Sequence, residues 1–415
     1  MTFNPLQEKG RSLEQQFRSW EEMNLAPYGK SEIHPFSRAR IILMNGIEME
    51  AALFSHGFVR QSDNPEIREK LTILRRIEQQ QQKMINWLIP PEESVLETAM
   101  GYEQTEIDLT AWIARTESNS YVKAVMNYGL LDDFDHLYRL ANLYDLTEQG
   151  DGEKIVGDLT EILPGRPTAD QHVHPLDTLR AAVKFDRSDI LTRLHLLTLF
   201  STEQQTLNFY SGAGNRISSS LGRSLFQEIA MAEEQHVTFY ECLIDPGRSW
   251  LERLLVHEYN ECYLYYCCME SEGDSRIKWV WQQFLEDEIE HLKVASFLIQ
   301  EVEGRDPMEI LPDHFPKLTI LDSNKEYIRS VLAEQVDLTT IREQFLSMSK
   351  VDAGSFLLTY QNAVNGKGLV PSLQVIAESI RRNGEDFRNE QRGPHPVESM
   401  RDRNIVQRVI KYRNE

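Results

Sequence analysis

The chain has 415 residues, a length that suggests two or three domains and enough material for a sizeable core. Its 65 acidic residues outnumber its 44 basic residues, and the formal net charge of −21 argues against a broad nucleic-acid surface or an anionic-membrane surface. The N-terminus lacks a signal-peptide pattern and no apolar run is long enough to cross a membrane, so we expect a cytoplasmic protein.

Residues 1–37 are interpreted as an N-terminal extension, and residues 38–145 are predicted to form four helices joined by short turns. Helix-breaking stretches mark the turns: QSDNPE at 61–66, IPPEES at 89–94 and RTESNS at 115–120. The middle connection offers about four loop residues, which span at most about 14 Å, whereas crossing a bundle needs roughly 28 Å. We therefore expect an up-down-up-down order of helices.

Residues 146–189 form a polar connector that contains glycine and proline, and residues 190–304 repeat the four-helix pattern. The corresponding breakers are SGAGN at 211–215, DPG at 245–247 and EGD at 272–274. Residues 305–415 are predicted to be a helical C-terminal extension without a further copy of the pattern. The expected fold class is all-α, with two tandem four-helix bundles.

The stretch LFQEIAMAEEQHVTFYECLI, residues 224–243, places a glutamate and a histidine in an apolar stripe. Glu233 and His236 follow Leu225 and Ile229 at helical three-and-four spacing, so all four lie on one face that should point into a core. An ionised carboxylate removed from water without a partner costs several kcal/mol or more. The pattern therefore predicts a buried cation.

The same Glu-x-x-His pair recurs further along the chain as Glu288 and His291, again in an apolar stripe. Glu203 precedes Glu233 by the same number of residues as Glu258 precedes Glu288. One constant offset in residue number therefore relates a first group, Glu203, Glu233 and His236, to a second group, Glu258, Glu288 and His291. Residues 190–300 are therefore interpreted as two copies of one helical hairpin, each of which supplies Glu and Glu-x-x-His. The chain has only 11 histidines, which makes a chance match of both pairs improbable.

A second constant offset places side chains that resemble ligands in the N-terminal half as well, which we interpret as a diverged duplicate. These positions are Glu48, Glu78, Gln81, Glu103, Asp133 and His136. Glutamine is a weak neutral ligand and aspartate is shorter than glutamate, so a degenerate or single-metal site is expected there. A second working centre remains the alternative.

The ligand set of the second half resembles that of the ferritin-like diiron carboxylate proteins. It comprises Glu203, Glu233, His236, Glu258, Glu288 and His291. Glu261 follows Glu258 at the same spacing at which Glu106 follows Glu103, and a Glu-x-x-Glu on the third helix is similar to rubrerythrins, in which the extra glutamate is a metal ligand. The chain departs from rubrerythrins because it lacks a rubredoxin-type domain, so its electron donor is unknown. Glu261 is equally compatible with a supporting role.

The resemblance implies two iron ions, or in some members manganese, that react with peroxide or dioxygen. It implies that Glu233 and Glu288 bridge the metals and that His236 and His291 each cap one metal. It also implies that three glutamates change position during the reaction, namely Glu203, Glu258 and Glu261. Tyr210 and Tyr265 lie about two helical turns beyond Glu203 and Glu258 and either relay protons or electrons or serve as ordinary core tyrosines.

The leading expectation is a diiron oxidoreductase that reduces peroxide or dioxygen. An oxygenase or oxidase that acts on a small organic substrate is one alternative, and it would need an apolar channel to the metals. A non-catalytic protein that binds or stores metal is a second, and an interaction scaffold built from the helical repeats is a third. Association with further copies of the chain stays open.

Overall fold

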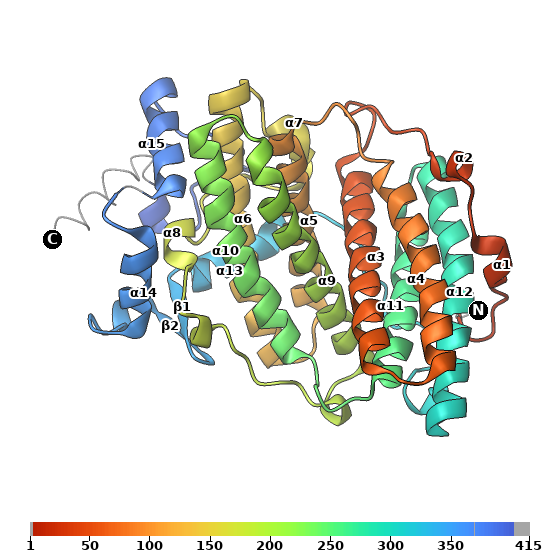
Figure 1. The fold of residues 1–415 in the computed structure, drawn as a ribbon. Coiled ribbons are helices and arrows are strands. Elements are labelled where there is room, and N and C mark those ends of the chain that lie inside the picture. Colours follow the sequence, from red (N-terminus) through yellow and green to blue (C-terminus); the bar gives the residue numbers. More distant parts are fainter. Residues whose placement is uncertain (1–2, 369, 402–415) are drawn as a thin grey trace. The chain divides into compact units, whose positions relative to one another are not determined.

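The computed structural model describes residues 3–368 and 370–401 (Figure 1). It is mostly helical, and most of its long helices pack against a long helix that is consecutive in the chain. The long helices are α3 (Pro35–Gln61), α4 (Pro65–Asn86), α5 (Val95–Thr116), α6 (Ser120–Glu148), α9 (Ile190–Ala213), α10 (Ser220–Leu243), α11 (Trp250–Ser271) and α12 (Ser275–Glu303). Within the described ranges, no helix combines the length and the apolar character that a membrane crossing requires.

Shorter elements occupy the N-terminal segment, the connector and the C-terminal segment, and one lies in the turn between α9 and α10. The short α-helices are α1 (Leu13–Gln16), α2 (Trp20–Met23), α7 (Glu153–Val156), α8 (Thr168–Gln171), α13 (Lys325–Gln335), α14 (Phe356–Asn365) and α15 (Pro371–Asn383). The 3-10 turns are η1 (Gly157–Leu159), η2 (Pro175–Asp177), η3 (Phe185–Arg187), η4 (Gly214–Arg216), η5 (Pro307–Glu309), η6 (Met348–Lys350) and η7 (Glu398–Met400).

The ends of the long helices lie at the stretches that the sequence marks as breakers. The side chain of Asn64 accepts a hydrogen bond from the backbone N–H of Glu66 at 2.9 Å, and Pro65 occupies the first turn of α4, where its missing N–H costs nothing. Ser94 and Glu97 form a reciprocal capping box at the start of α5. The predicted positions of these turns are thus confirmed.

The chain divides into two compact units, each made of several chain segments. The first unit contains residues 1–92, 182–205 and 244–321. It therefore holds the hairpin α3–α4, the hairpin α11–α12 and most of α9. In this unit α3 contacts α11 and α4 contacts α12, and the short helix α1 contacts both α4 and α12.

The second unit contains residues 93–181, 206–243 and 322–415. It holds the hairpin α5–α6, the helix α10 and the last residues of α9. Its apolar core is continuous with the C-terminal segment, because Ile328 and Leu332 of α13 and Val375 and Ile376 of α15 are buried in the same cluster as side chains of α5, α6 and α10. Helices α13 and α15 of the C-terminal segment thus contribute to the core of this unit.

One element of the C-terminal segment differs from the helical expectation. Residues Leu338–Ile341 (β1) and Gln344–Ser347 (β2) form an antiparallel hairpin, in whose turn the backbone of Arg342 has a positive φ of 54°. Polar and apolar residues do not alternate in DLTTIREQFLS, so the stretch lacks the period-2 pattern that would predict a strand. The helical prediction for residues 402–415 lies outside the described residues.

The compact units also group the helices differently from the division expected from sequence, which places residues 38–145 and 190–304 in separate bundles. The structure joins the first hairpin of the N-terminal half to the last hairpin of the second half, and α5–α6 to α10. Duplicated hairpins have nearly interchangeable apolar stripes, so exchanging partners preserves the pattern of each helix. Periodicity alone cannot choose between these groupings.

Candidate metal centres

The first unit gathers one histidine and a set of glutamates from α3, α4, α11 and α12. One ligand atom each of Glu78, Glu258, Glu261 and His291 lies within 4.8 Å of the others, and all four side chains are buried. Glu288 joins them, since its Oε2 lies 2.9 Å from Nδ1 of His291 and its Oε1 accepts a hydrogen bond from Nε2 of Gln81 at 2.7 Å. Together with Glu48 on α3, these residues are called the first-unit cluster below.

Burial controls the charge state of the first-unit cluster. It raises the pKa of Glu78 to about 7, and burial together with the charge of Glu288 raises the pKa of Glu48 well above its ordinary value. Burial also opposes the charged forms of Glu288 and His291, yet their mutual attraction outweighs it, lowering the pKa of Glu288 and raising that of His291 to about 10. Without a cation, this cluster retains protons at neutral pH.

Several oxygens of the first-unit cluster have no hydrogen-bond donor among the described residues. They include Oε2 of Glu48 and Oε2 of Glu78, both of which are removed from solvent. A buried polar atom without a partner costs about 1–3 kcal/mol, so a set of them at one place calls for a common ligand. Carboxylate and imidazole groups in this number suit a divalent cation such as iron or manganese.

The second unit assembles a similar cluster from α5, α6 and α10. One ligand atom each of Glu103, Asp133, His136 and Glu233 lies within 4.8 Å of the others. His236 completes this group, which we call the second-unit cluster, because its Nδ1 lies 3.2 Å from both Oε2 of Glu233 and Oδ1 of Asp133. All five side chains are fully buried.

Glu233 lies between the two histidines of the second-unit cluster. Its Oε1 is 2.9 Å from Nδ1 of His136, and its Oε2 is 3.2 Å from Nδ1 of His236. Burial opposes ionisation of Glu233, but both imidazoles together lower its pKa below the ordinary value. Burial raises the pKa of Glu103 to about 7 and also raises that of Asp133, whose Oδ2 accepts no hydrogen bond within the described part of the chain.

Two tyrosines donate hydrogen bonds to cluster carboxylates. The hydroxyl of Tyr265 on α11 donates to Oε1 of Glu48, and that of Tyr210 on α9 donates to Oε1 of Glu103. Burial and the adjacent carboxylate raise the pKa of each tyrosine well above its ordinary value, so both keep their protons. Each tyrosine therefore fixes one carboxylate oxygen and leaves the other available.

The structure divides the ligand set that the sequence assigns to a single site. Glu258, Glu261, Glu288 and His291 lie in the first-unit cluster, whereas Glu233 and His236 lie in the second-unit cluster. The positions expected to form a degenerate site are shared in the same way. Glu48, Glu78 and Gln81 belong to the first unit, and Glu103, Asp133 and His136 belong to the second.

Two further predicted ligands lie on α5 and α9. Glu106 is buried one turn after Glu103, and its Oε1 accepts a hydrogen bond from Oγ1 of Thr206 at 3.1 Å. Glu203 is also fully buried and precedes Thr206 by one turn of α9. Its place on the helical face that includes Tyr210 follows from the spacing.

Gln81 stands at the position that is equivalent to His236, and the grouping of the hairpins decides which cluster contains this glutamine. Gln81 is in the first-unit cluster, so that cluster contains one histidine, and the second-unit cluster contains two. The sequence interpretation pairs Gln81 with His136 in one half of the chain. His136 and His236 come from different halves of the chain, but both lie in the second-unit cluster. The second unit therefore has the more complete set of nitrogen ligands.

Sequence reasoning missed the residues that contact the outer nitrogen of each histidine. Nε2 of His291 lies 2.8 Å from Oε1 of Gln16, and Nε2 of His136 lies 2.7 Å from Oε1 of Gln171. Nε2 of His236 lies 3.2 Å from Oδ2 of Asp132. The offset that relates the ligands of the two halves also relates Gln16 to Gln171, so extending the repeat comparison into the N-terminal segment would have found them.

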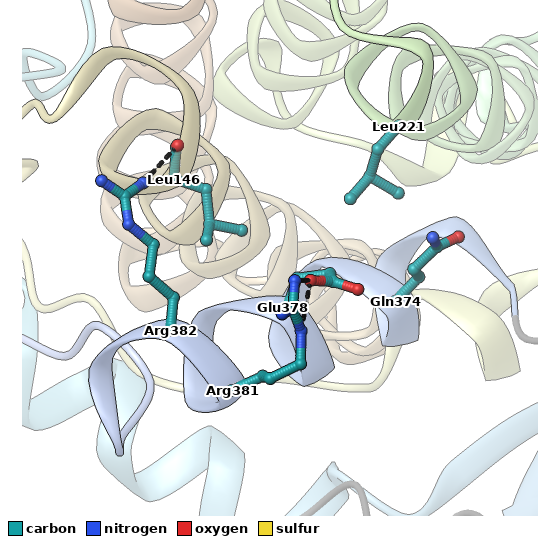
Figure 2. Close-up of a pocket in the computed structure, with 6 residues that line it drawn as sticks. All are labelled: Leu146, Leu221, Gln374, Glu378, Arg381 and Arg382. Carbon is teal, nitrogen blue, oxygen red and sulfur yellow. Dashed lines mark hydrogen bonds and ion pairs between the residues drawn. The ribbon is translucent and has the colours of Figure 1, made fainter.

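A surface pocket of the second unit contains no comparable group. Figure 2 shows its lining residues, which are Leu146, Leu221, Gln374, Glu378, Arg381 and Arg382. The charged side chains of this pocket have partners close by, because Arg381 pairs with Glu378 and Arg382 donates to the carbonyl oxygen of Leu146 at 2.5 Å. The pocket therefore adds nothing to the metal chemistry.

No protein-family model, curated protein or solved structure matches the chain. The class of protein thus rests on the fold and the clusters alone. The chain is a predominantly helical protein with buried carboxylate–histidine groups that could bind metal ions.

Proposed function

We propose that the chain is a ferritin-like diiron carboxylate protein that reduces peroxide or dioxygen. In this proposal α3, α4, α11 and α12 form one four-helix bundle, and α5, α6, α10 and the end of α9 contribute to another. The second-unit cluster is proposed as the principal dinuclear centre, with iron as the metal and manganese as the alternative. The first-unit cluster is proposed as a weaker site.

The position of Glu233 carries this proposal. Its two carboxylate oxygens face Nδ1 of two different histidines, His136 and His236, so that one carboxylate lies between two nitrogen donors. Glu233, His136 and His236 would together hold a pair of divalent ions, since carboxylates and imidazoles from facing helices are the ligands of such pairs in helical bundles. Glu103 and Asp133 supply further oxygens, and their raised pKa values indicate that the metal-free cluster is short of positive charge.

Glu288 has the corresponding place in the first-unit cluster, but only one of its neighbours is a histidine. Its Oε2 faces Nδ1 of His291, and its Oε1 accepts from the amide of Gln81. A neutral amide is a weak ligand for iron, so we propose that this cluster holds its metals less tightly or holds a single ion.

When bound, a pair of ferrous ions supplies the two electrons that reduce one peroxide. The protein's own groups hold and orient the metals and exclude bulk water from the cluster, since each of the five second-unit side chains is fully buried. The hydroxyl of Tyr210 fixes Oε1 of Glu103 and holds a proton beside this carboxylate. Tyr265 is proposed to do the same at Glu48, and Glu261 to adjust to the charge of the first-unit cluster.

The test uses the full chain purified without oxygen and loaded with ferrous iron. Metal analysis gives the number of ions per chain, and addition of limiting peroxide should oxidise two ferrous ions for each peroxide consumed. Glu233→Gln should abolish most of this reaction, because the carboxylate between the two histidines is lost. Glu234→Gln is the matched control, since Glu234 is the exposed neighbour on the same helix.

Three results would contradict the proposal in different ways. Failure to bind metal would remove the dinuclear centre altogether. Binding without oxidation by peroxide or dioxygen would indicate a protein that only holds metal. Oxygen uptake that depends on an added organic compound would instead identify an oxygenase or oxidase.

A further inference from the structure

A short segment next to α12 holds the outer nitrogen of His291. Gln16, the last residue of α1, presents its Oε1 to Nε2 of His291 at 2.8 Å. The amide nitrogen of Gln16 donates to the carbonyl oxygen of Arg11 at 2.7 Å and to that of Asp287 at 3.3 Å. The backbone N–H of Arg11 donates in turn to the carbonyl oxygen of Glu286 at 2.9 Å. Residues 10–16, which we call the first strap, are thereby attached to the helix that carries the ligand.

The second unit repeats this arrangement beside α6. Oε1 of Gln171 lies 2.7 Å from Nε2 of His136, and its amide nitrogen donates to the carbonyl oxygens of Arg166 at 2.8 Å and Asp132 at 3.3 Å. The N–H of Arg166 donates to the carbonyl oxygen of Leu131 at 3.1 Å. Residues 165–171 are the second strap, and each of these contacts has its counterpart at the equivalent positions of the first strap and α12.

Each strap begins with a glycine that lies against the ligand helix. A Cβ added to Gly10 would come within 2.7 Å of the backbone nitrogen of Glu290, and one added to Gly165 within 2.8 Å of the backbone nitrogen of Asp135. Such distances are too short for any side chain, so only glycine permits this approach. The stretches GRSLEQQ and GRPTADQ therefore share the three residues that the arrangement uses, namely glycine, arginine and glutamine.

The hydrogen bonds decide which way each glutamine amide faces. The amide nitrogen of Gln16 donates to two main-chain carbonyls, so its Oε1 is the atom that faces His291. An amide oxygen only accepts hydrogen bonds, which requires a proton on Nε2 of the ring. The same reasoning applies to Gln171 and His136. In both clusters Nδ1 is left to face the carboxylates.

We propose that the two straps are positioning devices that select Nδ1 of His291 and His136 as the metal-binding nitrogen. This inference rests on the proposed function, since it assumes that the clusters bind divalent cations. A hydrogen bond to the outer nitrogen fixes the tautomer and the ring orientation of a ligating histidine. The straps would thus prepare both histidines before a metal arrives, and Gln16 and Gln171 act through the rings without touching the metal.

The test combines a spectroscopic signature with metal affinity in the full chain. Zinc, which is diamagnetic, is loaded into protein labelled with ¹⁵N, and long-range ¹H–¹⁵N spectra of the histidines show which ring nitrogen is metal-bound and which carries a proton. We expect Nε2 of His136 and His291 to be protonated and Nδ1 to bind zinc. Gln171→Leu and Gln16→Leu should weaken zinc binding at the corresponding cluster on the order of 10- to 100-fold and speed exchange of the Nε2 proton.

Matched controls and a conservative variant separate positioning from folding. Gln15→Leu and Gln374→Leu remove exposed glutamines and should leave both readouts unchanged. Gln171→Glu keeps an acceptor oxygen for His136, so it should restore the protonated Nε2 signal that Gln171→Leu loses. This rescue would not occur if the glutamine only filled space.

The outcomes distinguish this inference from the proposed function. A wild-type chain that binds no metal contradicts both. A wild-type chain that binds zinc through Nε2, or whose affinity is unchanged in Gln171→Leu and Gln16→Leu, overturns the positioning role alone. The wild-type spectrum decides the question even where a leucine variant does not fold.

Discussion

The two clusters differ in the partners of one pair of equivalent aspartates, Asp132 and Asp287, which directly precede the cluster carboxylates of α6 and α12. In the second unit, Oδ2 of Asp132 lies 3.2 Å from Nε2 of His236, and its Oδ1 accepts from Arg166 at 2.6 Å. In the first unit, Oδ2 of Asp287 lies 2.5 Å from the guanidinium of Arg18, and its Oδ1 is 3.1 Å from Arg11.

This difference follows from the replacement of histidine by Gln81. A buried carboxylate without a partner is costly, so the aspartate that would have contacted a second histidine needs another donor. Arg18 is this donor for Asp287 in the first unit. The residue equivalent to Arg18 in the second unit is Val173, which has no hydrogen-bond donor in its side chain. The absence of a histidine and the presence of an arginine therefore go together, which indicates that the first-unit cluster is adapted to one histidine.

The largest expected effect comes from removing the central carboxylate of either cluster. Glu233→Ala should eliminate metal from the second unit, and Glu288→Ala should eliminate it from the first, because each removes the group that lies between two ligands. Metal analysis of the purified variants measures the loss. If the second unit is the principal centre, Glu233→Ala should remove a larger amount of tightly bound metal than Glu288→Ala does. Equal losses would contradict the ranking of the two clusters.

Reciprocal substitutions at the histidine position sharpen the comparison further. His236→Gln gives the second unit the ligands of the first and should weaken its metal binding on the order of 10- to 100-fold, as the loss of a nitrogen donor and its hydrogen bond implies. Gln81→His should strengthen binding in the first unit by a smaller factor, because Arg18 already occupies Oδ2 of Asp287.

Competition titrations with a chelator measure both changes. Arg18→Val combined with Gln81→His frees Asp287 and should increase the gain. A double variant no better than Gln81→His alone would show that the arginine does not limit the first-unit cluster.

The pH dependence of stability should separate metal-free from metal-loaded protein. Glu78 and Glu103 have a pKa of about 7 in the folded chain against 4.5 ordinarily, so the folded state binds more protons than the unfolded state between these values. The free energy of unfolding of the metal-free chain should therefore fall as pH rises from about 4.5 to about 7, with each group contributing on the order of 1–3 kcal/mol.

The histidine of the first-unit cluster acts in the same direction at higher pH. His291, with a pKa of about 10, stabilises the metal-free fold fully below about 6.5 and loses this contribution as pH rises toward 10. Denaturant unfolding across this range, with and without ferrous iron or zinc, measures the slope. Metal should remove the decline, and Glu78→Gln should reduce it. A metal-free chain that gains stability between pH 5 and 7 would contradict the assigned protonation.

The smallest effects are expected at the tyrosines. Tyr210→Phe and Tyr265→Phe each remove one hydrogen bond to a buried carboxylate and should lower the free energy of unfolding by about 1–3 kcal/mol while metal stays bound. If Tyr210 also provides a proton, Tyr210→Phe should slow peroxide consumption more than Tyr265→Phe does. Single-turnover rates measure this difference, and equal rates would assign both tyrosines a purely structural role.

Much of the fold and of the ligand inventory could be predicted from the sequence. Helix ends lie at the breakers, which are residues 61–66, 89–94, 115–120, 245–247 and 272–274. Asparagine, serine and aspartate cap a helix and proline interrupts one through contacts with residues that are near in sequence. The spacing of Glu233 and His236, and of Glu288 and His291, places these residues on buried faces because helical periodicity is also a local property.

The assembly of the clusters could not be predicted in the same way. The sequence interpretation places Gln81 and His136 in one site, but Gln81 contacts Glu288 of α12 and His136 contacts Glu233 of α10. Related hairpins offer similar stripes to any partner, so pairwise spacing contains no information on which hairpins meet. Helical periodicity does not point to Gln16 and Gln171, because both lie in short segments; only the constant offset between the two halves relates them.

The sequence by itself determined that the long helices carry acidic and histidine side chains on their buried faces, because the three-and-four spacing fixes which residues share a face. The tertiary structure decided which of these side chains share a cluster, and hence that one cluster has two histidines and the other has one. Contacts between distant segments depend on the packing of whole helices, and a duplicated chain has more than one way to satisfy the same pattern.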